Sequence, residues 1–99
     1  MQEHPLKTLE RLDPKLLSLV EEARQFAFSD GALPRKVKLL IALALLAANG
    51  AHDGVKSLAQ VAMQAGATKE EIVEVLRVAQ YISGVGSVFT ASSALSELF

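Results

Sequence analysis

The chain has 99 residues, a net charge of −1 and no cysteine. This length predicts a single domain, 1–99, and the lack of cysteine excludes disulfides, thiolate metal sites and cysteine nucleophiles. The near-zero net charge gives no electrostatic reason to expect binding to nucleic acid.

The first clear helix is predicted to follow an N-terminal arm, residues 1–12, which is expected to be loosely docked and to hold a short helical stretch. Asp13-Pro14 has the pattern of an N-cap followed by proline at the first helical position. Apolar residues then recur every three or four positions and form one stripe: Leu16, Leu19, Val20, Ala23, Phe26 and Ala27. Ser29-Asp30-Gly31 is expected to end this helix.

The second predicted helix starts at Pro34 and ends near Asn49-Gly50, and its leucines and alanines favour helix over strand. Its longest uninterrupted apolar run, residues 39–48, is about half of the ~20 residues that a membrane-spanning helix needs. Because residues 37–48 are apolar on nearly every face, this helix is expected to be central and buried on all sides.

The third predicted helix runs from residue 52 or 53 to residue 65, with Gly66 as its C-terminal glycine. Thr68 and Glu71 then have the spacing of a capping box, which predicts the start of a fourth helix. The side chains expected to point inward from the fourth helix are Ile72, Val75, Leu76, Ala79 and Ile82.

The glycine-containing segment 83–86 is expected to separate the fourth helix from a fifth helix over about residues 87–98. No segment shows the alternating pattern of a strand, and the predicted connections are short. The fold class is therefore all-α, a compact bundle of five or six helices.

Apolar residues form 51% of the chain, and the mean hydropathy is +0.30. A globule of this size buries only about 60–65% of the surface that its unfolded chain exposes, so its interior cannot hold all of them. There is no apolar segment of membrane length and no leader pattern at residues 1–5. We therefore expect identical subunits to cover the apolar surface that the interior cannot hold. The protein is expected in the cytoplasm, without a membrane partner.

Four segments share a pattern with one known family. They are Leu33-Pro34-Arg35-Lys36-Val37-Lys38 before the apolar helix, residues 47–50, residues 62–72 with Gly-Ala-Thr-Lys-Glu-Glu-Ile, and residues 81–86. Together they cover about half of the chain and resemble the carboxymuconolactone decarboxylase-like family, which includes the alkylhydroperoxidase D-like proteins. The resemblance implies an alkylhydroperoxidase D-like helical fold and assembly into trimers or hexamers.

The redox branch of that family carries a glutamate in the apolar helix, Cys-x-x-Cys at the next helix start and a histidine one turn later. The resemblance places these residues at Leu39, at Ala51 and Gly54, and at Leu58. The decarboxylase branch implies an acidic residue near Gly54 and a histidine at Leu58. Every one of these positions departs from the family pattern, so peroxidase or disulfide-reductase activity cannot be carried over to this chain.

His52 and Asp53 lie at the helix start where the family places its redox pair. One interpretation makes them catalytic, with His52 as a general acid or base near neutral pH. The other makes Asp53 a helix cap and His52 a solvent-facing loop residue, because adjacent side chains point in different directions and do not readily pair. No metal site and no cofactor are predicted.

Arg35, Lys36 and Lys38 occupy the first turn of the second predicted helix, where positive charge is unfavourable for the helix dipole. One interpretation is that Arg35 and Lys38 bind a small anion together with the free N–H groups of that turn. The alternative is a solvated rim, or pairing with acidic residues of a neighbouring subunit. Tyr81 either reaches a ligand pocket or lies at the edge of the core.

Two functions remain open at this point. The first is a non-redox oligomeric scaffold or small-ligand-binding protein, which the leucines at positions 39 and 58 favour because buried polar groups would need partners. The second is a thiol-free enzyme, a decarboxylase or a lactone-acting enzyme, on a small carboxylate. The enzyme requires His52 or Asp53 to face a pocket near a cation, whereas the first function requires Leu39 and Leu58 to pack together.

Overall fold

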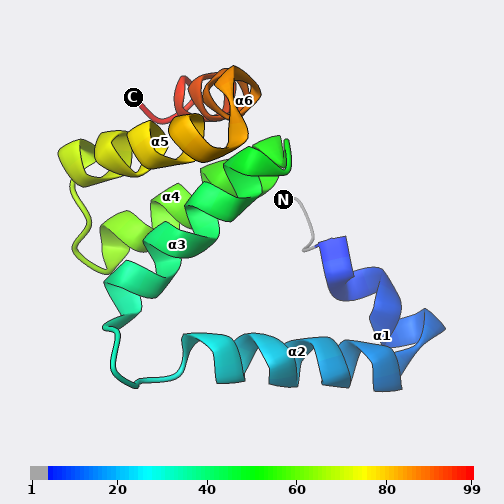
Figure 1. Cartoon of the computed structure of the whole chain (residues 1–99). Coiled ribbons are helices and arrows are strands. Elements are labelled where there is room, and N and C mark those ends of the chain that lie inside the picture. Colours follow the sequence, from blue (N-terminus) through cyan, green and yellow to red (C-terminus); the bar gives the residue numbers. More distant parts are fainter. Residues whose placement is uncertain (1–4) are drawn as a thin grey trace.

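The computed structural model describes residues 5–99, and its regular elements are all helices. In chain order they are the 3-10 helix η1 (Pro5–Thr8), α1 (Leu9–Leu12), α2 (Pro14–Phe28), α3 (Arg35–Ala48), α4 (His52–Gln64), α5 (Lys69–Ser83) and α6 (Val85–Leu95) (Figure 1). The all-α prediction is confirmed. Residues 1–4 of the predicted arm lie outside the described residues.

Short polar signals set the helix starts as predicted. Asp13 Oδ1 accepts a hydrogen bond from Leu16 N at 3.0 Å, and Pro14 begins α2. Thr68 and Glu71 form a complete capping box at α5, in which Glu71 N donates to Thr68 Oγ1 at 3.1 Å and Thr68 N donates to Glu71 Oε1 at 2.9 Å. Gly66 ends α4 with a φ of 102°, a left-handed conformation that glycine adopts without strain.

Helices α3 to α6 pack around one apolar core. Its largest fully buried side chains are Leu43, Val55 and Ile72, one each from α3, α4 and α5. Buried alanines from α3, α4 and α6 complete it, namely Ala47, Ala59, Ala91 and Ala94. Their small side chains let the helix axes approach closely, so the core is filled largely by backbone and short side chains.

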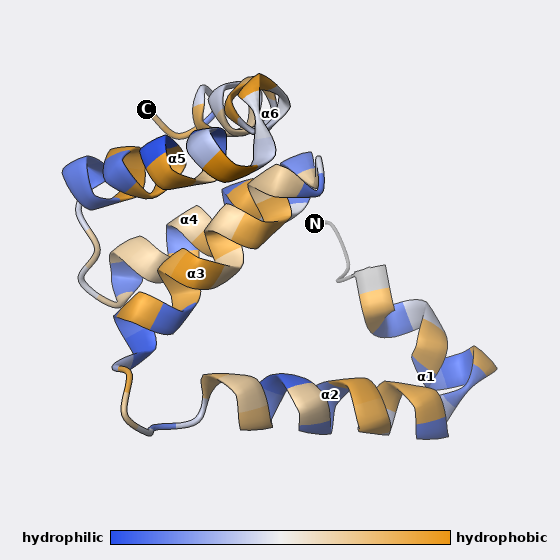
Figure 2. Cartoon of the chain, viewed as in Figure 1, coloured by the Kyte–Doolittle hydropathy of each residue, from blue (hydrophilic) through white to orange (hydrophobic). Residues whose placement is uncertain are grey.

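Helix α2 lies apart from this core. Figure 1 shows it running away from the start of α3, and it contains no buried residue. Its predicted apolar stripe is present, as the colouring of Figure 2 shows, but the large side chains of the stripe are exposed, with Phe26 at 83%. Residues 5–99 of one chain therefore leave the stripe largely uncovered.

The prediction that α3 is buried on all sides is wrong for the single chain. Leu39, Leu43 and Ala47 on one face are buried, whereas Ile41 is 45% and Leu45 is 60% exposed. The cause is that the helices packed against α3 cover one of its faces and leave the other open. Within residues 5–99 no helix is both long and apolar enough to span a membrane.

Two smaller predictions also need correction. Ile82 was expected to point inward, but it lies in the last turn of α5 and is 74% exposed, because α6 packs against the face that carries Ile72 and Ala79. The fifth predicted helix starts earlier and ends earlier than expected, since Gly84, with a φ of 88°, already separates α5 from α6. Residues 96–99 form a turn after α6.

Candidate ligand-binding site

Leu39 of α3 and Leu58 of α4 belong to one apolar cluster. Leu39 is buried together with Ala62 and Ala67, and Leu58 packs against them. These are the positions at which the redox pattern discussed above would place its glutamate and its histidine. A proton relay therefore cannot form here, because neither side chain titrates.

The two positions of the cysteine pattern carry no reactive group either. Gly54, in the first turn of α4, faces Leu46 of α3 so closely that a Cβ at residue 54 would lie 3.1 Å from both Leu46 Cδ atoms. Ala51 immediately precedes α4 and is half-buried. The space that a thiol pair would need is occupied in part by the Leu46 side chain.

A pocket of about 360 Å³ opens beside the Leu39–Leu58 cluster, between α2 and the start of the bundle. Its lining residues are Arg24, Gln25 and Phe28 of α2, Arg35 and Leu39 of α3, and Leu58 and Val61 of α4. Two smaller hollows, on the arm and on α5, are lined mainly by charged side chains. A third, of about 340 Å³, lies between α5 and α6 and is lined by Val73, Leu76, Arg77, Gln80 and Val88. The pocket at Leu39 thus combines an apolar floor with a polar rim, which is the usual chemistry of a small-molecule site.

The two arginines of this pocket differ in their electrostatic surroundings. Arg24 Nη2 is held by Glu21 Oε2 at 2.6 Å within α2. Arg35 makes no ion pair with any of residues 5–99, and it lies in the first turn of α3, where the helix dipole adds positive potential. The unpaired charge at the mouth of the pocket is therefore Arg35, as the anion-site interpretation requires.

Lys38, the second cation of the anion-site interpretation, contacts the end of α2, and its ligand role stays a prediction. Its Nζ donates to the backbone oxygen of Ser29 at 2.5 Å, which links α3 to the end of α2. This bond helps to hold the α2 residues that line the pocket against α3 and α4. Tyr81 lies on α5, is 83% exposed and does not line the pocket, so its ligand role stays a prediction.

His52 and Asp53 lie in the first turn of α4 and form a pair, contrary to the expectation that adjacent side chains would diverge. His52 Nδ1 is 3.0 Å from Asp53 Oδ1, and His52 Nε2 is 3.3 Å from Glu97 Oε2 in the turn after α6. The hydrogen bond with Asp53 raises the pKa of His52, burial opposes the rise, and the charge of Glu97 adds to it.

This histidine cluster is separate from the pocket. Leu58 follows His52 by six residues, which places the two side chains about 120° apart around α4. The side chains that α4 contributes to the pocket are Leu58 and Val61, whereas His52 and Lys56 contact Glu97. His52 and Lys56 thus share the Glu97 carboxylate in an ion-pair cluster outside the pocket.

Comparison with known proteins identifies the family. The family model "Carboxymuconolactone decarboxylase family" matches residues 14–97. A crystal structure of a carboxymuconolactone decarboxylase family protein from Legionella pneumophila, in its apo form, superposes with a TM-score of 0.85 at 34% identity. That likeness covers 92% of this chain and 81% of the other.

Two curated sequences are also similar, and both are described as uncharacterized. The protein from Cupriavidus necator is 34% identical over 89% of this chain and 78% of its own length. The protein from Methanocaldococcus jannaschii is 30% identical over 95% of this chain and 91% of its own length. The chain belongs to the carboxymuconolactone decarboxylase family, and it is a member without cysteine.

Proposed function

We propose that this chain is a non-redox member of its family that binds a small organic anion in the pocket between α2, α3 and α4. The observation that carries the proposal is the placement of Arg35, without an ion-pair partner among residues 5–99, at the rim of an apolar pocket. A ligand with an apolar body and one carboxylate matches both parts of this surface.

The size and lining of the pocket support a small ligand. Its volume of about 360 Å³ lies at the lower end of the range that small-molecule sites occupy, about 300–1,000 Å³. Phe28, Leu39 and Leu58 offer apolar contacts, while the planar guanidinium of Arg35 suits a carboxylate because it can donate two parallel hydrogen bonds.

The alternative, a thiol-free enzyme acting on a small carboxylate, has less support. General acid or base catalysis needs a titratable group within hydrogen-bond reach of the substrate. The candidates for that role are His52 and Asp53; His52 contacts Asp53 and Glu97, and neither candidate lines the pocket. Leu39 and Leu58 supply packing where a relay would be needed.

The binding proposal is tested by thermal shift with hexanoate, phenylacetate and phenylbutyrate, each compared with its neutral amide. A ligand present at a hundred times its Kd stabilises the folded state by about 2.7 kcal/mol, so at least one carboxylate should raise Tm while its amide does not. Replacing Arg35 by glutamine should weaken binding about ten- to a hundred-fold, because a charge-assisted hydrogen bond is lost.

The matched control is Lys15→Gln, which removes an exposed cation of α2 that lies outside the pocket and should leave the shift unchanged. If carboxylates and amides act alike, or if Arg35→Gln binds as tightly as the wild type, the anion-site proposal is wrong. Conversion of a bound carboxylate, followed by NMR and abolished by His52→Ala, would establish the enzyme alternative instead.

We also propose that the protein works as a homo-oligomer, a trimer or a hexamer, in the cytoplasm. Support for self-association comes from the unpartnered α2 stripe and from the exposed side chains Ile41 and Leu45 of α3. Exposed apolar surface of this extent on two neighbouring helices is typical of a protein interface. A second copy of the chain is the partner that offers both stripes at once.

A further inference from the structure

The turn after α6, residues 96–99, reaches three parts of the fold with three consecutive side chains. Glu97 contacts His52 and Lys56 of α4, Leu98 packs against the core, and Phe99 lies under Lys69 of α5, whose Nζ is 5.1 Å from the ring centroid. The turn therefore closes over the first turns of α4 and α5, as the position of the C-terminus beside α5 in Figure 1 also shows.

The number of protons on His52 limits how many of these contacts can form together. Its two ring nitrogens face two different carboxylates, Asp53 at 3.0 Å and Glu97 at 3.3 Å. The contact with Asp53 is a hydrogen bond, whereas the contact with Glu97 is an ion pair that requires a charged ring. A neutral imidazole has a single N–H and no charge, whereas the imidazolium has two N–H groups and a positive charge. Protonation of His52 is therefore required for the ion pair with Glu97 to exist beside the hydrogen bond with Asp53.

We propose that His52 is a proton-operated clasp, in which protonation docks the turn 96–99 onto α4 and deprotonation releases the Glu97 side of the clasp. The charged groups facing His52 are Asp53 and Lys56 on α4 and Glu97 in the turn; on α6 it meets the backbone of Ser93. Lys56, 3.4 Å from Glu97 Oε1, holds the same carboxylate at any pH at which it is charged. Deprotonation of His52 therefore frees Glu97 only in part. It loosens the turn 96–99 without unfolding the bundle.

The direction of the pH effect follows from the contacts. The hydrogen bond with Asp53 and the charge of Glu97 raise the pKa of His52 above its ordinary value of about 6.5, although burial opposes this. The stabilisation is fully present below that ordinary value and is lost as pH rises through the raised value. The turn is thus docked in mild acid and loosened as pH rises through the raised pKa of His52.

The 99-residue chain offers a simple spectroscopic test, since it contains two histidines. NMR titration of the histidine ring protons, with His52→Gln to assign them, gives the midpoint of His52 directly. Amide hydrogen exchange of Leu98 and Phe99 reports docking, because both donate to the oxygen of Leu95 in the last turn of α6. Their protection factors should fall roughly two- to five-fold across the His52 midpoint, the size expected for an exposed ion pair.

Three variants make the test decisive. Glu97→Gln should lower the His52 midpoint and remove the step in protection, and His52→Gln should make protection independent of pH over this range. Lys69→Met, which breaks the contact with Phe99, should lower protection but keep the step. A wild-type chain without the step, or a His52 midpoint that Glu97→Gln leaves unchanged, would overturn the clasp.

Discussion

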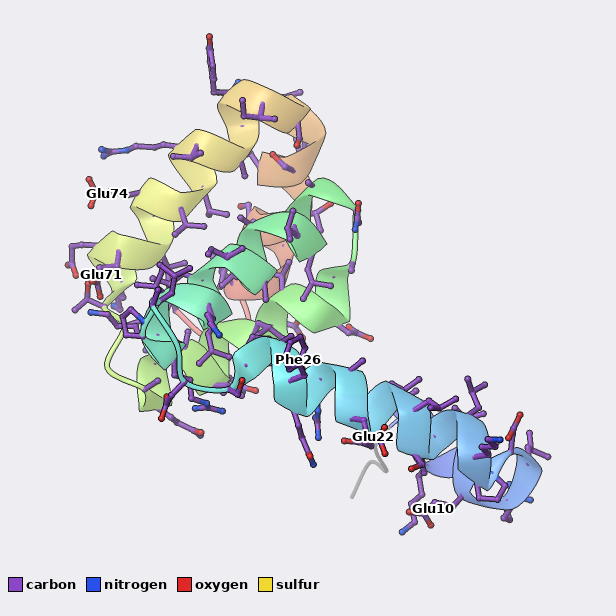
Figure 3. The ribbon with its side chains drawn as sticks, turned by 60° about the horizontal axis from the view of Figure 1, so that its bottom comes forward. Glu10, Glu22, Phe26, Glu71 and Glu74 are labelled. Carbon is purple, nitrogen blue, oxygen red and sulfur yellow. The ribbon has the colours of Figure 1, made fainter. Side chains whose placement is uncertain are left out.

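Lys36 Nζ of α3 donates a hydrogen bond to Glu71 Oε2 of α5 at 2.9 Å, while the other oxygen of the same carboxylate caps α5 through Thr68 N at 2.9 Å. One glutamate thereby fixes the start of α5 and joins it to the start of α3 (Figure 3). The two helices are distant in sequence at this point, so the contact helps to set how they pack.

Acid should weaken this junction. The hydrogen bond with Lys36 lowers the pKa of Glu71, and the backbone bond with Thr68 adds to the effect. The contribution of Glu71 is present above its ordinary pKa of about 4.3 and is lost as pH falls through the lowered value. Tm measured between pH 3 and pH 6 should therefore fall more steeply for the wild type than for Glu71→Gln.

Glu74→Gln is the matched control for this titration. Glu74 lies one turn further along α5 and makes no ion pair with any of residues 5–99. Its variant should keep the steep acid dependence of the wild type. Equal slopes for the wild type and Glu71→Gln would show that the Lys36 contact contributes nothing to stability.

Truncation of the core should be costly at Leu43. This side chain is fully buried between α3 and the helices packed on it, so Leu43→Ala loses apolar burial and leaves a cavity. We expect a loss of about 2–5 kcal/mol in the free energy of unfolding by urea. Leu33→Ala, at a half-exposed position in the loop before α3, should cost no more than about 1 kcal/mol. Similar costs at the two sites would contradict the assigned core.

Self-association should depend on the exposed stripes of α2 and α3. A carboxylate at Phe26 or Ile41 would have to be desolvated in a subunit interface, so Phe26→Glu and Ile41→Glu should lower the mass found by light scattering. Gln60→Glu, on the exposed side of α4, should keep the mass of the wild type. A wild-type chain that stays monomeric at high concentration would refute the oligomer.

Helix boundaries could be read from the sequence because their signals are local. Asp13-Pro14, the Thr68–Glu71 pair and Gly66 act over three or four residues, and each occupies its predicted role. The partner of each apolar face could not be read in the same way. The periodicity of apolar residues identifies a face of a helix but not what covers that face. Ile41 is an example, because it is an apolar residue of a helix and is nevertheless exposed in the single chain.

The candidate site was predicted in part. Arg35 was named from its position at a helix start, and the packing of Leu39 with Leu58 was expected if the relay is absent. The α2 wall of the pocket was missed because it depends on how α2 is oriented after the loop at residues 29–34. Glu97 was missed as the partner of His52 because the two residues are far apart in the chain and no local pattern connects them.

Gly54 and Leu46 decide how easily a side chain can be introduced at residue 54. A cysteine introduced at residue 54 would bring its Cβ to 3.1 Å from the Leu46 methyl carbons, so the Leu46 side chain, which packs against the core, would have to shift slightly. Any side chain larger than hydrogen at residue 54 therefore depends on how far the Leu46 side chain can yield. The first turn of α4 and the middle of α3 are thus coupled sterically at this position, so a substitution in one helix is felt in the other.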